Sequence, residues 1–549
     1  MPLQKNQVLT LRVERLSSDG SGVAHSPDGE TVFIPGAAPG DEARVRIVKD
    51  CKRYAFGILD EVLTPSPDRI PVDCAVAGPC GGCSLRHLDY AAELRAKQEN
   101  VADAFARIGG LNVPVLPIVG SPEVNRYRNK VQFPVGVDKS GKPCIGFYAG
   151  RTHRIVPCPD CRLQPGVLNE IGNALCAFFA EKGIQPYSEE TGRGLVRHIF
   201  LRRGAHSGQI MVCLVCTRVR LPSAEELCTR LKAQFAEITT ILLNVNAKNT
   251  NVILGTETHT LYGPGYIEDT LCGVPVQLGP LSFYQVNTLA AEQLYGIAAQ
   301  YAQLTPDDLL LDLYCGMGTI GLSMAAHCRE LIGVEIVPEA IESAKANAAR
   351  MGTDVAAKSR FFCADAGQAA TRLAAEGLHP DIVMLDPPRK GCDEATLSAV
   401  VRMAPRRVVY VSCNPATAAR DAAWLEQNGY HAEKVQPVDL FPRTLHCECV
   451  IALSKGEIDS KKVRVEFSLE GMDTSGLQKG ATYPEIKARV LEQTGLKVSS
   501  LYISQVKQKC GLEVRENHHK AKSENTKQPQ CPKEKEDAIV DALRHFQMI

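Results

Sequence analysis

The sequence predicts a multidomain α/β protein, because three kinds of pattern follow one another along its 549 residues. Short alternating segments near the N-terminus predict a small β-barrel, and clustered cysteines follow them. Buried-type strands then alternate with helices, as in a doubly wound α/β domain. We expect a barrel at 1–63, a central α+β domain at 64–270, a doubly wound domain at 271–455 and a small α-rich extension at 456–549.

The overall composition is that of an ordinary globular protein, with 44% hydrophobic and 23% charged residues. The net charge is zero, so any basic surface for a nucleic acid must be local. The N-terminus lacks the apolar core of a signal peptide, and no run of 18 apolar residues predicts a membrane span. We therefore expect a cytoplasmic protein whose 21 cysteines are metal ligands, core residues or catalytic thiols rather than disulfides.

The first 63 residues alternate in the strand period, with strands predicted at 8–14, 31–34 and 43–48 and glycine turns between them. Basic residues occur throughout these strands and turns, and two aromatic residues lie close by. The basic residues are Arg12, Arg15, Arg44, Arg46, Lys49, Lys52 and Arg53, and the aromatic ones are Tyr54 and Phe56. This pattern allows RNA contact, but it is equally typical of a solvated barrel face.

A glycine-rich turn predicts a nucleotide site in the doubly wound domain. The apolar strand 309–314 leads into Gly316, Gly318 and then an alanine-rich helix, so that the backbone can approach a nucleotide closely. By itself this spacing is a weak signal that fits a dinucleotide as well. Glu335 ends the next strand, where a carboxylate accepts both ribose hydroxyls, and Asp365 ends a third strand, within reach of an adenine edge.

The turn after the fourth strand favours S-adenosylmethionine over a nicotinamide dinucleotide. Asp386, Pro387 and Pro388 follow the apolar run 381–385, at the place where a methyl acceptor must sit. The alternative is a glycine turn with scattered surface acids. That alternative requires four independent coincidences at strand ends.

Cys413 and Glu448 are the candidate nucleophile and base. Carbon 5 of uracil attacks a sulfonium methyl group only after a thiolate has added at carbon 6, and a base must then remove the carbon 5 proton. Cys413 follows the strand-like run 407–410, and Arg389 and Lys390 are candidate cations for lowering its pKa. The alternatives are an inert core thiol for Cys413 and a solvated carboxylate for Glu448.

A second group of cysteines predicts a metal site. Cys74, Cys80 and Cys83 have the spacing C-x5-C-x2-C, with glycines that bend the chain between them. Cys158 and Cys161 are both candidates for a fourth ligand. Four thiolates suit a [4Fe-4S] cluster or a structural zinc ion, and the spacing does not separate the two. Unconnected free cysteines are the other interpretation.

The extension at 456–549 has its own pattern. A strand is predicted at 463–469, and helices are predicted at 483–491 and 499–509 with a glycine turn between them. Two helices joined in this way, the second of them basic, fit a helix-turn-helix that binds nucleic acid. A packing or partner-binding module is the alternative.

Residues 5–453 resemble the bacterial uracil-5 methyltransferases that act on large-subunit (23S) ribosomal RNA. The similarity is specific at 79–88, 127–132 and 282–287. It implies that the barrel is a TRAM domain, which binds RNA, and that 79–88 is an iron–sulfur motif. In the family the fourth cluster ligand precedes an x-Leu/Ile-Gln step, which is present after Cys161, so the resemblance selects Cys161 over Cys158.

The same resemblance implies roles for the remaining candidates. It makes Cys413 the nucleophile and Glu448 the base. The implied contacts of S-adenosylmethionine are Gln285, Tyr314, Glu335, Asp365 and Asp386. The loop glycines, Gly316 and Gly318, complete the candidate cofactor site. Arg443 departs from the family, whose members often have histidine there, but the mechanism is unaffected. We expect a monomer, without a membrane partner, that acts on 23S rRNA.

Four other functions remain to be weighed. The first is a transfer RNA uracil-5 methyltransferase, although such enzymes often lack the barrel and the cysteine motif. The second is a non-catalytic RNA-binding or ribosome-assembly factor, which the intact Cys413, Glu448 and Asp386 argue against. A DNA cytosine-5 methyltransferase usually has its nucleophile in a Pro-Cys step, whereas Cys413 follows Ser412. The acidic Pro-Pro turn disfavours an oxidoreductase.

Overall fold

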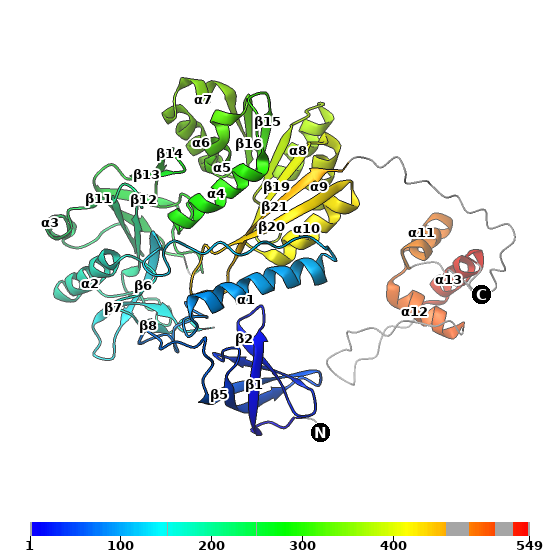
Figure 1. Ribbon diagram of the computed structural model, residues 1–549, viewed down its shortest axis with the longest axis horizontal. Helices are drawn as coiled ribbons and strands as arrows, with labels where there is room; N and C mark the ends of the chain where they lie inside the picture. The colour runs from blue at the N-terminus through cyan, green and yellow to red at the C-terminus, as the bar shows by residue number, and fades with distance from the viewer. Residues whose placement is uncertain (1–2, 151, 249, 457–482, 511–530, 547–549) are drawn as a thin grey trace. The chain divides into compact units, whose positions relative to one another are not determined.

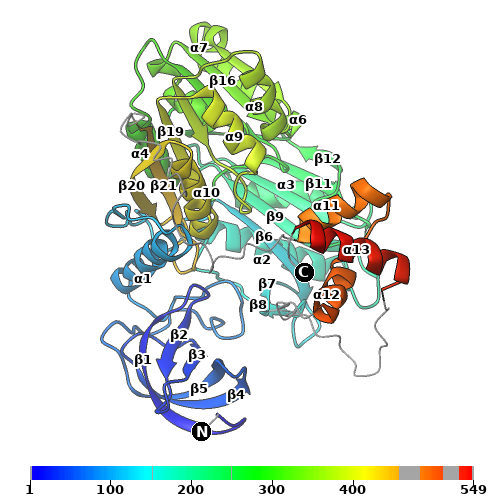
Figure 2. The same ribbon diagram turned by 90° about the vertical axis from the view of Figure 1, so that its right-hand side faces the viewer.

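The computed structural model describes residues 3–150, 152–248, 250–456, 483–510 and 531–546. The chain divides into two compact units, residues 1–459 and residues 460–549. Figures 1 and 2 show the first unit as a β-barrel, a helix α1 that lies between the barrel and a doubly wound sheet, and a separate central sheet. In the described part of the chain, no helix combines the length and apolarity needed to span a membrane.

The N-terminal strands form a closed barrel in the order β1-β2-β3-β5-β4. The strands are β1 (Val8–Leu16), β2 (Ser21–His25), β3 (Thr31–Pro35), β4 (Glu42–Asp50) and β5 (Tyr54–Thr64). Buried and exposed residues alternate along β4, as expected for a strand with one face toward the barrel interior. The predicted barrel is therefore confirmed.

The segment that follows the barrel along the chain forms a seven-stranded sheet with the order β12-β11-β10-β9-β6-β7-β8. Helices α2 (Gly166–Glu181) and α3 (Ala224–Gln234) bury their apolar residues in a core shared with this sheet. The strands are β6 (Lys130–Val137), β7 (Pro143–Tyr148), β8 (Ile155–Pro157), β9 (Val196–Arg203), β10 (Ile210–Cys216), β11 (Ile238–Val245) and β12 (Glu257–Tyr262). A hairpin of β13 (Ile267–Leu271) and β14 (Val274–Leu278) leads onward to α4.

The doubly wound sheet has the order β17-β16-β15-β18-β19-β21-β20, in which β17 to β19 are parallel and β21 and β20 are antiparallel. The chain order reverses between β15 and β18, and this switch point places a ligand crevice at the carboxyl ends of the strands. The strands are β15 (Leu309–Leu313), β16 (Glu330–Glu335), β17 (Ser359–Cys363), β18 (Ile382–Leu385), β19 (Arg407–Ser412), β20 (Tyr430–Val438) and β21 (Glu448–Lys455).

Alternate residues of these strands enter two different cores, one on each face of the sheet. Residues of α4, α5 and α6 share the first core, and residues of α8, α9 and α10 share the second. The helices are α4 (Thr288–Ala302), α5 (Thr319–Met324), η2 (Ala325–His327), α6 (Pro338–Arg350), α7 (Thr353–Lys358), α8 (Ala366–Ala375), α9 (Glu394–Met403) and α10 (Pro415–Gln427). The predicted Rossmann-like domain is confirmed.

Helix α1 (Tyr90–Asp103) begins at Asp89, whose side chain accepts a hydrogen bond from the Ala92 amide at 2.6 Å. The segment that continues this helix, η1 (Ala104–Ile108), is a π-helix. Val101 and Phe105 pack into the core beneath α8, α9 and α10. The wider turn accompanies this packing, since π-turns occur as local insertions in α-helices.

The second unit has a small core of its own, built from α11 (Tyr483–Thr494), α12 (Ser500–Lys509) and α13 (Lys533–His545). The first two helices lie where the sequence places them, and Gly495 in the turn between them has a φ of +68°. Helix α13 was not predicted. The strand predicted at 463–469 lies outside the described residues.

Candidate active site

The glycine loop lies at the carboxyl end of β15 and leads into α5. Tyr314, Gly316 and Gly318 all have positive φ values of 67°, 56° and 79°, so that the loop turns sharply. A Cβ on Gly318 would meet neighbouring side chains at 3.2 Å, which explains the need for glycine there. The Gly316 amide donates to Glu335 Oε2 at 3.1 Å, and so the carboxylate at the end of β16 lies directly beside the loop.

Three carboxylates interact around this loop. Asp312 Oδ2 accepts from the Gly321 amide at 3.0 Å, but its buried Oδ1 has no hydrogen-bond partner among the described residues. The pKa of Asp312 is raised to about 8, chiefly by burial and also by the nearby charges of Asp386 and Glu335. Burial also raises the pKa of Asp386 to about 7. A ligand that carries ammonium and sulfonium charges would stabilise this acidic group.

Sequence analysis missed Asp312 as a functional residue, although a signal was present. An acidic residue inside an otherwise apolar strand, just before a glycine loop, is costly to bury without a partner. The structure shows that Asp312 is 1% exposed. We therefore add it to the candidate ligand-binding residues.

The other candidate cofactor residues lie on the neighbouring elements. Asp365 follows β17 and caps α8 by accepting from the Gln368 amide at 3.1 Å. The Tyr314 hydroxyl lies 3.4 Å from Thr396 Oγ1 at the start of α9. Gln285 lies between β14 and α4, and its carbonyl accepts from Asn129 Nδ2 at 2.7 Å, so the central sheet holds this segment.

Cys413 and Glu448 lie on neighbouring antiparallel strands. Ser412 at the end of β19 is paired with Cys449 of β21, so Cys413 and Glu448 are one step beyond that pair on each strand. The pKa of Glu448 is raised to about 8, chiefly by burial and also by Asp386, while Arg389 opposes both effects. Burial raises the pKa of the Cys413 thiol, Glu448 also raises it, and Arg389 opposes both effects. The structure therefore brings these four groups into one electrostatic cluster.

Arg389 is the cation of this cluster. Its carbonyl accepts from Asn414 Nδ2 at 2.9 Å, and its guanidinium lies 3.3 Å from both ring nitrogens of His446. Burial and then Arg389 lower the pKa of His446, so the neutral ring accepts this hydrogen bond. Lys390, the other candidate cation, does not interact with Cys413 and instead lines a separate cavity.

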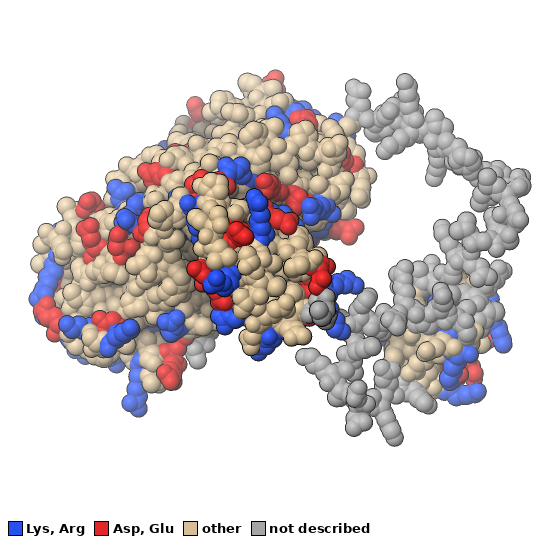
Figure 3. All heavy atoms as spheres, turned by 60° about the horizontal axis from the view of Figure 1, so that its bottom comes forward, with Lys and Arg blue, Asp and Glu red and all other residues tan. Residues whose placement is uncertain are grey.

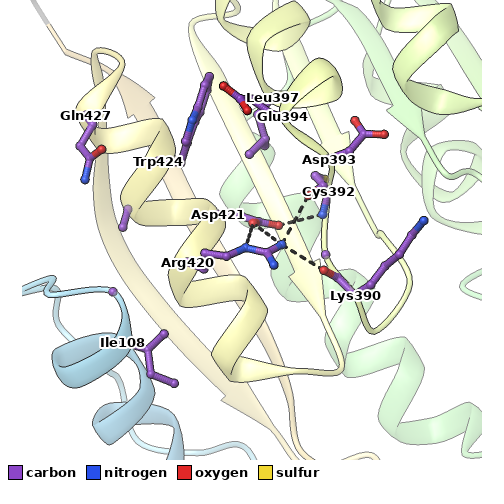
Figure 4. A pocket seen from close by; sticks show the side chains of 13 residues that line it. Ile108, Lys390, Cys392, Asp393, Glu394, Leu397, Arg420, Asp421, Trp424 and Gln427 are labelled. Carbon is purple, nitrogen blue, oxygen red and sulfur yellow. Dashed lines mark hydrogen bonds and ion pairs between the residues drawn. The ribbon is translucent and has the colours of Figure 1, made fainter. Parts of the chain in front are cut away.

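That cavity has a volume of about 550 Å³ and lies beside the turn after β18 (Figure 4). In Figure 4 the exposed Arg420 lies against Asp421, and Trp424 stands on the same helix, α10. None of the candidate catalytic or cofactor residues lines it. The cavity therefore lies apart from Cys413 and from the glycine loop.

A buried ion network holds the loop 439–447, which joins β20 to β21 and ends at Glu448. Lys97 of α1 is 1% exposed and donates to Glu93 Oε1 at 2.7 Å, to Asp439 Oδ1 at 2.8 Å and to the Phe441 carbonyl at 3.2 Å. The Tyr90 hydroxyl donates to Asp439 Oδ2 at 2.9 Å. Sequence analysis missed this network, because Asp439 is 342 residues from Lys97 along the chain.

Arg443 joins the same loop to the cysteine segment. Its amide donates to Glu93 Oε1 at 2.6 Å, and its guanidinium donates to the Leu88 carbonyl at 2.8 Å. Its carbonyl accepts from the amides of Ser84 and Leu85 at 3.0 and 3.2 Å. Arg443 therefore has a structural role, because it connects the loop to α1 and to the cysteine segment. The sequence did not predict this role.

The cysteines of the predicted metal site lie close enough to influence one another. Burial raises the pKa of Cys80, and the neighbouring Cys161 and Cys74 raise it further. Cys83, Cys158 and Cys161 share one small apolar cluster. No group of three or more His, Cys, Asp or Glu side chains in the described ranges has the arrangement of a metal site. The all-thiol donor set fits an iron–sulfur cluster or zinc, but the structure does not show the ligand geometry.

Comparison with known proteins identifies the family. Residues 223–456 match the family model described as tRNA (Uracil-5-)-methyltransferase, and residues 2–59 match the TRAM domain. An uncharacterized RNA methyltransferase of Halalkalibacterium halodurans is 43% identical over 453 residues, which cover 82% of this chain and 98% of the relative. The chain belongs to the uracil-5 RNA methyltransferase family. An uncharacterized RNA methyltransferase of Clostridium tetani is also similar to this chain. It is 40% identical over 83% of this chain and 98% of the relative.

A solved structure supports the same assignment for this methyltransferase. The tRNA (uracil-54, C5)-methyltransferase of Pyrococcus abyssi, in complex with S-adenosyl-L-homocysteine, has a TM-score of 0.65 and 27% identity. The match covers 81% of this chain and 100% of that one. The resemblance seen in the sequence is thus confirmed at the level of the family.

We predict that Lys97→Met lowers turnover by on the order of 10²-fold, because the loop that ends at Glu448 loses its clamp. The variant removes the cation between two buried carboxylates, of which Glu93 keeps only the longer ion pair with Arg443 at 3.5 Å, and we expect a loss of roughly 3–5 kcal/mol in the free energy of unfolding. Chemical denaturation and methyl-transfer kinetics measure the two effects. Lys345→Met, which removes an exposed lysine on α6, is the control. Unchanged turnover in folded Lys97→Met protein would show that the network does not position the loop.

We predict that Arg389→Gln moves the pH dependence of methyl transfer to higher pH. Arg389 lowers the pKa of both Cys413 and Glu448, so its removal raises both, and a higher pH is then needed to deprotonate the thiol and the carboxyl. The variant should be least active below pH 7 and should recover as the pH rises. Single-turnover rates across the pH range measure the shift, and Arg389→Lys should retain most of the original profile. A profile that falls in height without moving would contradict the role of Arg389.

Proposed function

We propose that the protein transfers a methyl group from S-adenosylmethionine to carbon 5 of a specific uridine in 23S rRNA. The observation that carries the proposal is the cluster of Cys413, Glu448, Asp386 and Arg389 at the carboxyl ends of the strands. A nucleophilic thiol, a base and a cation lie together beside a glycine loop with an acidic lining. The family assignment independently supports a uracil-5 methyltransferase.

S-adenosylmethionine, when bound, supplies an electrophilic methyl group. We propose that Gly316 and Gly318 allow its close approach, that Glu335 accepts the ribose hydroxyls and that Asp365 contacts the adenine. Gln285, Tyr314 and Asp386 complete the proposed set. The unpartnered Oδ1 of Asp312 and the raised pKa values of Asp312 and Asp386 fit a cationic ligand at this place. The related Pyrococcus abyssi structure, which contains S-adenosyl-L-homocysteine, supports the proposal.

In the proposed reaction, the Cys413 thiolate forms a bond to carbon 6 of the uracil, and the electron pair of the ring double bond moves to give an enolate. Carbon 5 then takes the methyl group, and S-adenosylhomocysteine leaves with the electron pair of the broken carbon–sulfur bond. Glu448 removes the proton from carbon 5. The carbon 5–carbon 6 double bond forms again as the Cys413 thiolate departs.

Three features of the chain adapt it to these steps. The high pKa of Glu448 makes it a stronger base than an exposed carboxylate, and Arg389 stabilises the thiolate form of Cys413. Phe283 is 72% exposed two residues before Gln285 and offers a stacking face to an unpaired base. We propose that the target uridine is flipped out of its stack, at a cost of a few kcal/mol.

The choice of 23S rRNA over transfer RNA rests on the TRAM barrel and the cysteine motif together. The alternative is a tRNA uracil-5 methyltransferase, and it has a specific observation in its favour. The matched family model carries tRNA in its description, and the Pyrococcus abyssi relative is a tRNA methyltransferase. A non-catalytic RNA-binding or assembly factor is disfavoured by the intact thiol and base.

We predict that labelled S-adenosylmethionine yields labelled 5-methyluridine in unmodified 23S rRNA and none in transfer RNA. The two RNAs are assayed in parallel, with Cys413→Ala as the inactive control. Label in transfer RNA alone would contradict the 23S rRNA target and support the tRNA alternative. Label in neither RNA from the unaltered protein would contradict the catalytic proposal.

A denaturing gel of the protein with its RNA separates the covalent mechanism from a direct methyl transfer. Glu448→Gln retains the thiol but cannot remove the carbon 5 proton, so it should trap the RNA in an adduct that survives a denaturing gel. The adduct should be absent in a Cys413→Ala, Glu448→Gln double variant. Free RNA with Glu448→Gln, under conditions in which the unaltered protein is active, would count against the role of Glu448.

We further propose that Cys74, Cys80, Cys83 and Cys161 hold a [4Fe-4S] cluster, with a structural zinc ion as the alternative. The mutual influence of these thiols, the apolar cluster that includes Cys83 and Cys161, and the Arg86 guanidinium beside Cys83 support a thiolate-bound group. Cys158 lies in the same apolar cluster. Its place in that cluster makes it the matched control for the fourth ligand.

We predict that anaerobic reconstitution loads about four iron and four sulfide per chain, with visible charge-transfer absorption. Cys161→Ser should lose this absorption and Cys158→Ser should keep it. Iron and sulfide analysis, together with absorption spectra, measures the outcome. Binding of one zinc ion instead would favour the alternative, and retention of the cluster in Cys161→Ser would refute the ligand assignment.

A further inference from the structure

The C-terminal unit lies beyond the family. The family match ends at residue 456, and the aligned relatives cover 82–83% of this chain. Residues 460–549 contain 16 Lys and Arg against 12 Asp and Glu, whereas residues 1–459 contain 46 against 50. Figure 3 shows acidic and basic side chains interspersed over one face of the first unit. The extension of this RNA methyltransferase therefore carries a net charge of +4, which balances the −4 of residues 1–459.

Three lysines from different parts of the unit gather near the start of α12. Lys487 of α11 donates to Ser500 Oγ at 2.7 Å, and Lys535 of α13 donates to the carbonyl of Lys497 at 2.9 Å. None of these ammonium groups pairs with a carboxylate among the side chains that the structure describes. Other cations of the unit do pair with acids: Arg489 with Glu492, Lys509 with Glu536 and Arg544 with Asp541.

Helix α12 adds a polar face next to these lysines. Ser500, Ser504 and Gln508 are spaced by four residues, lie along one side of the helix, and are exposed or half-exposed. Ile503 and Val506 on the other side are buried in the core of the unit. Residues 493–510 contain no Asp or Glu. We call Lys487, Lys497 and Lys535, together with Ser500, Ser504 and Gln508, the lysine surface.

We propose that the lysine surface binds the sugar–phosphate backbone of the RNA substrate, as a second RNA-binding element separate from the active site. Unpaired ammonium groups attract phosphates through charge and the release of counterions. Hydroxyl and amide groups beside them can hydrogen-bond to phosphate oxygens and to the ribose 2′-hydroxyls, by which RNA differs from DNA. The inference rests on the RNA substrate class of the family and holds for either ribosomal or transfer RNA.

Such a surface would increase affinity without taking part in chemistry. A second binding element on the same chain makes the approach of the RNA to the active site effectively intramolecular. Its contribution should therefore be largest for a long folded RNA. It should be small for a short stem-loop that contains only the target uridine.

The test compares two triple variants of the full-length protein. Lys487→Gln, Lys497→Gln and Lys535→Gln alter the lysine surface, and Arg489→Gln, Lys509→Gln and Arg544→Gln remove the same charge from ion-paired positions. Affinity for unmodified 23S rRNA and for a DNA of equal length is measured across salt concentration. Three lost phosphate contacts should reduce the slope of log K against log salt by roughly 2–3. Thermal unfolding checks that both variants fold.

We expect the lysine-surface variant to lose on the order of tenfold or more in RNA affinity at low salt, while the ion-paired variant changes little. Turnover on a short stem-loop should be unaltered in both. Equal losses in the two variants, or no loss in the first, would overturn the proposal. An equal loss for DNA would refute the assignment to RNA. Absence of methyl transfer by the unaltered protein would refute the proposed catalytic function but not this inference, because binding is measured without turnover.

Discussion

The buried ammonium group of Lys97 is the contact on which the rest of the active site depends. It comes from α1, which precedes the central sheet, and it neutralises Asp439 at the start of the loop that ends at Glu448. Two carboxylates as deeply buried as Glu93 and Asp439 are stable only around a cation. The position of Glu448 is therefore set by a helix outside the catalytic domain as well as by its own strand.

The second constraint is electrostatic and acts within the catalytic domain. Asp312, Asp386 and Glu448 are all buried enough to have pKa values near or above neutrality, and the charge of Asp386 adds to the cost of charging both Asp312 and Glu448. Arg389 is the cation that opposes this repulsion at Cys413 and Glu448. A positively charged cofactor at the glycine loop would likewise reduce the repulsion among these carboxylates. Cofactor binding and activation of the thiol are thus linked through one set of charges.

Local pattern was sufficient for the barrel, the doubly wound domain and the places of the candidate residues. Strand periodicity depends on neighbouring residues, and the carboxyl ends of parallel strands meet at one edge, so Glu335, Asp386 and Cys413 were placed correctly at strand ends. The Lys97–Asp439 contact was not predictable, because nothing local marks a lysine whose partner is 342 residues away. The π-turn at 104–108 also depends on packing against α10, and α13 was missed because its charged sequence masks a narrow apolar face.

The contacts of Arg443 explain how a cysteine site can matter to an enzyme whose proposed chemistry involves no electron transfer. Ser84 and Leu85 follow Cys83 directly, and their amides hold the Arg443 carbonyl, five residues before Glu448. Arg443 has a φ of +69°, a conformation that a non-glycine residue keeps only when its surroundings fix it. A group that orders Cys80 and Cys83 would therefore also order the loop that carries the base. In this arrangement a group held by the proposed cysteine site would act mechanically, because the residues after Cys83 fix one side of the candidate active site through backbone hydrogen bonds.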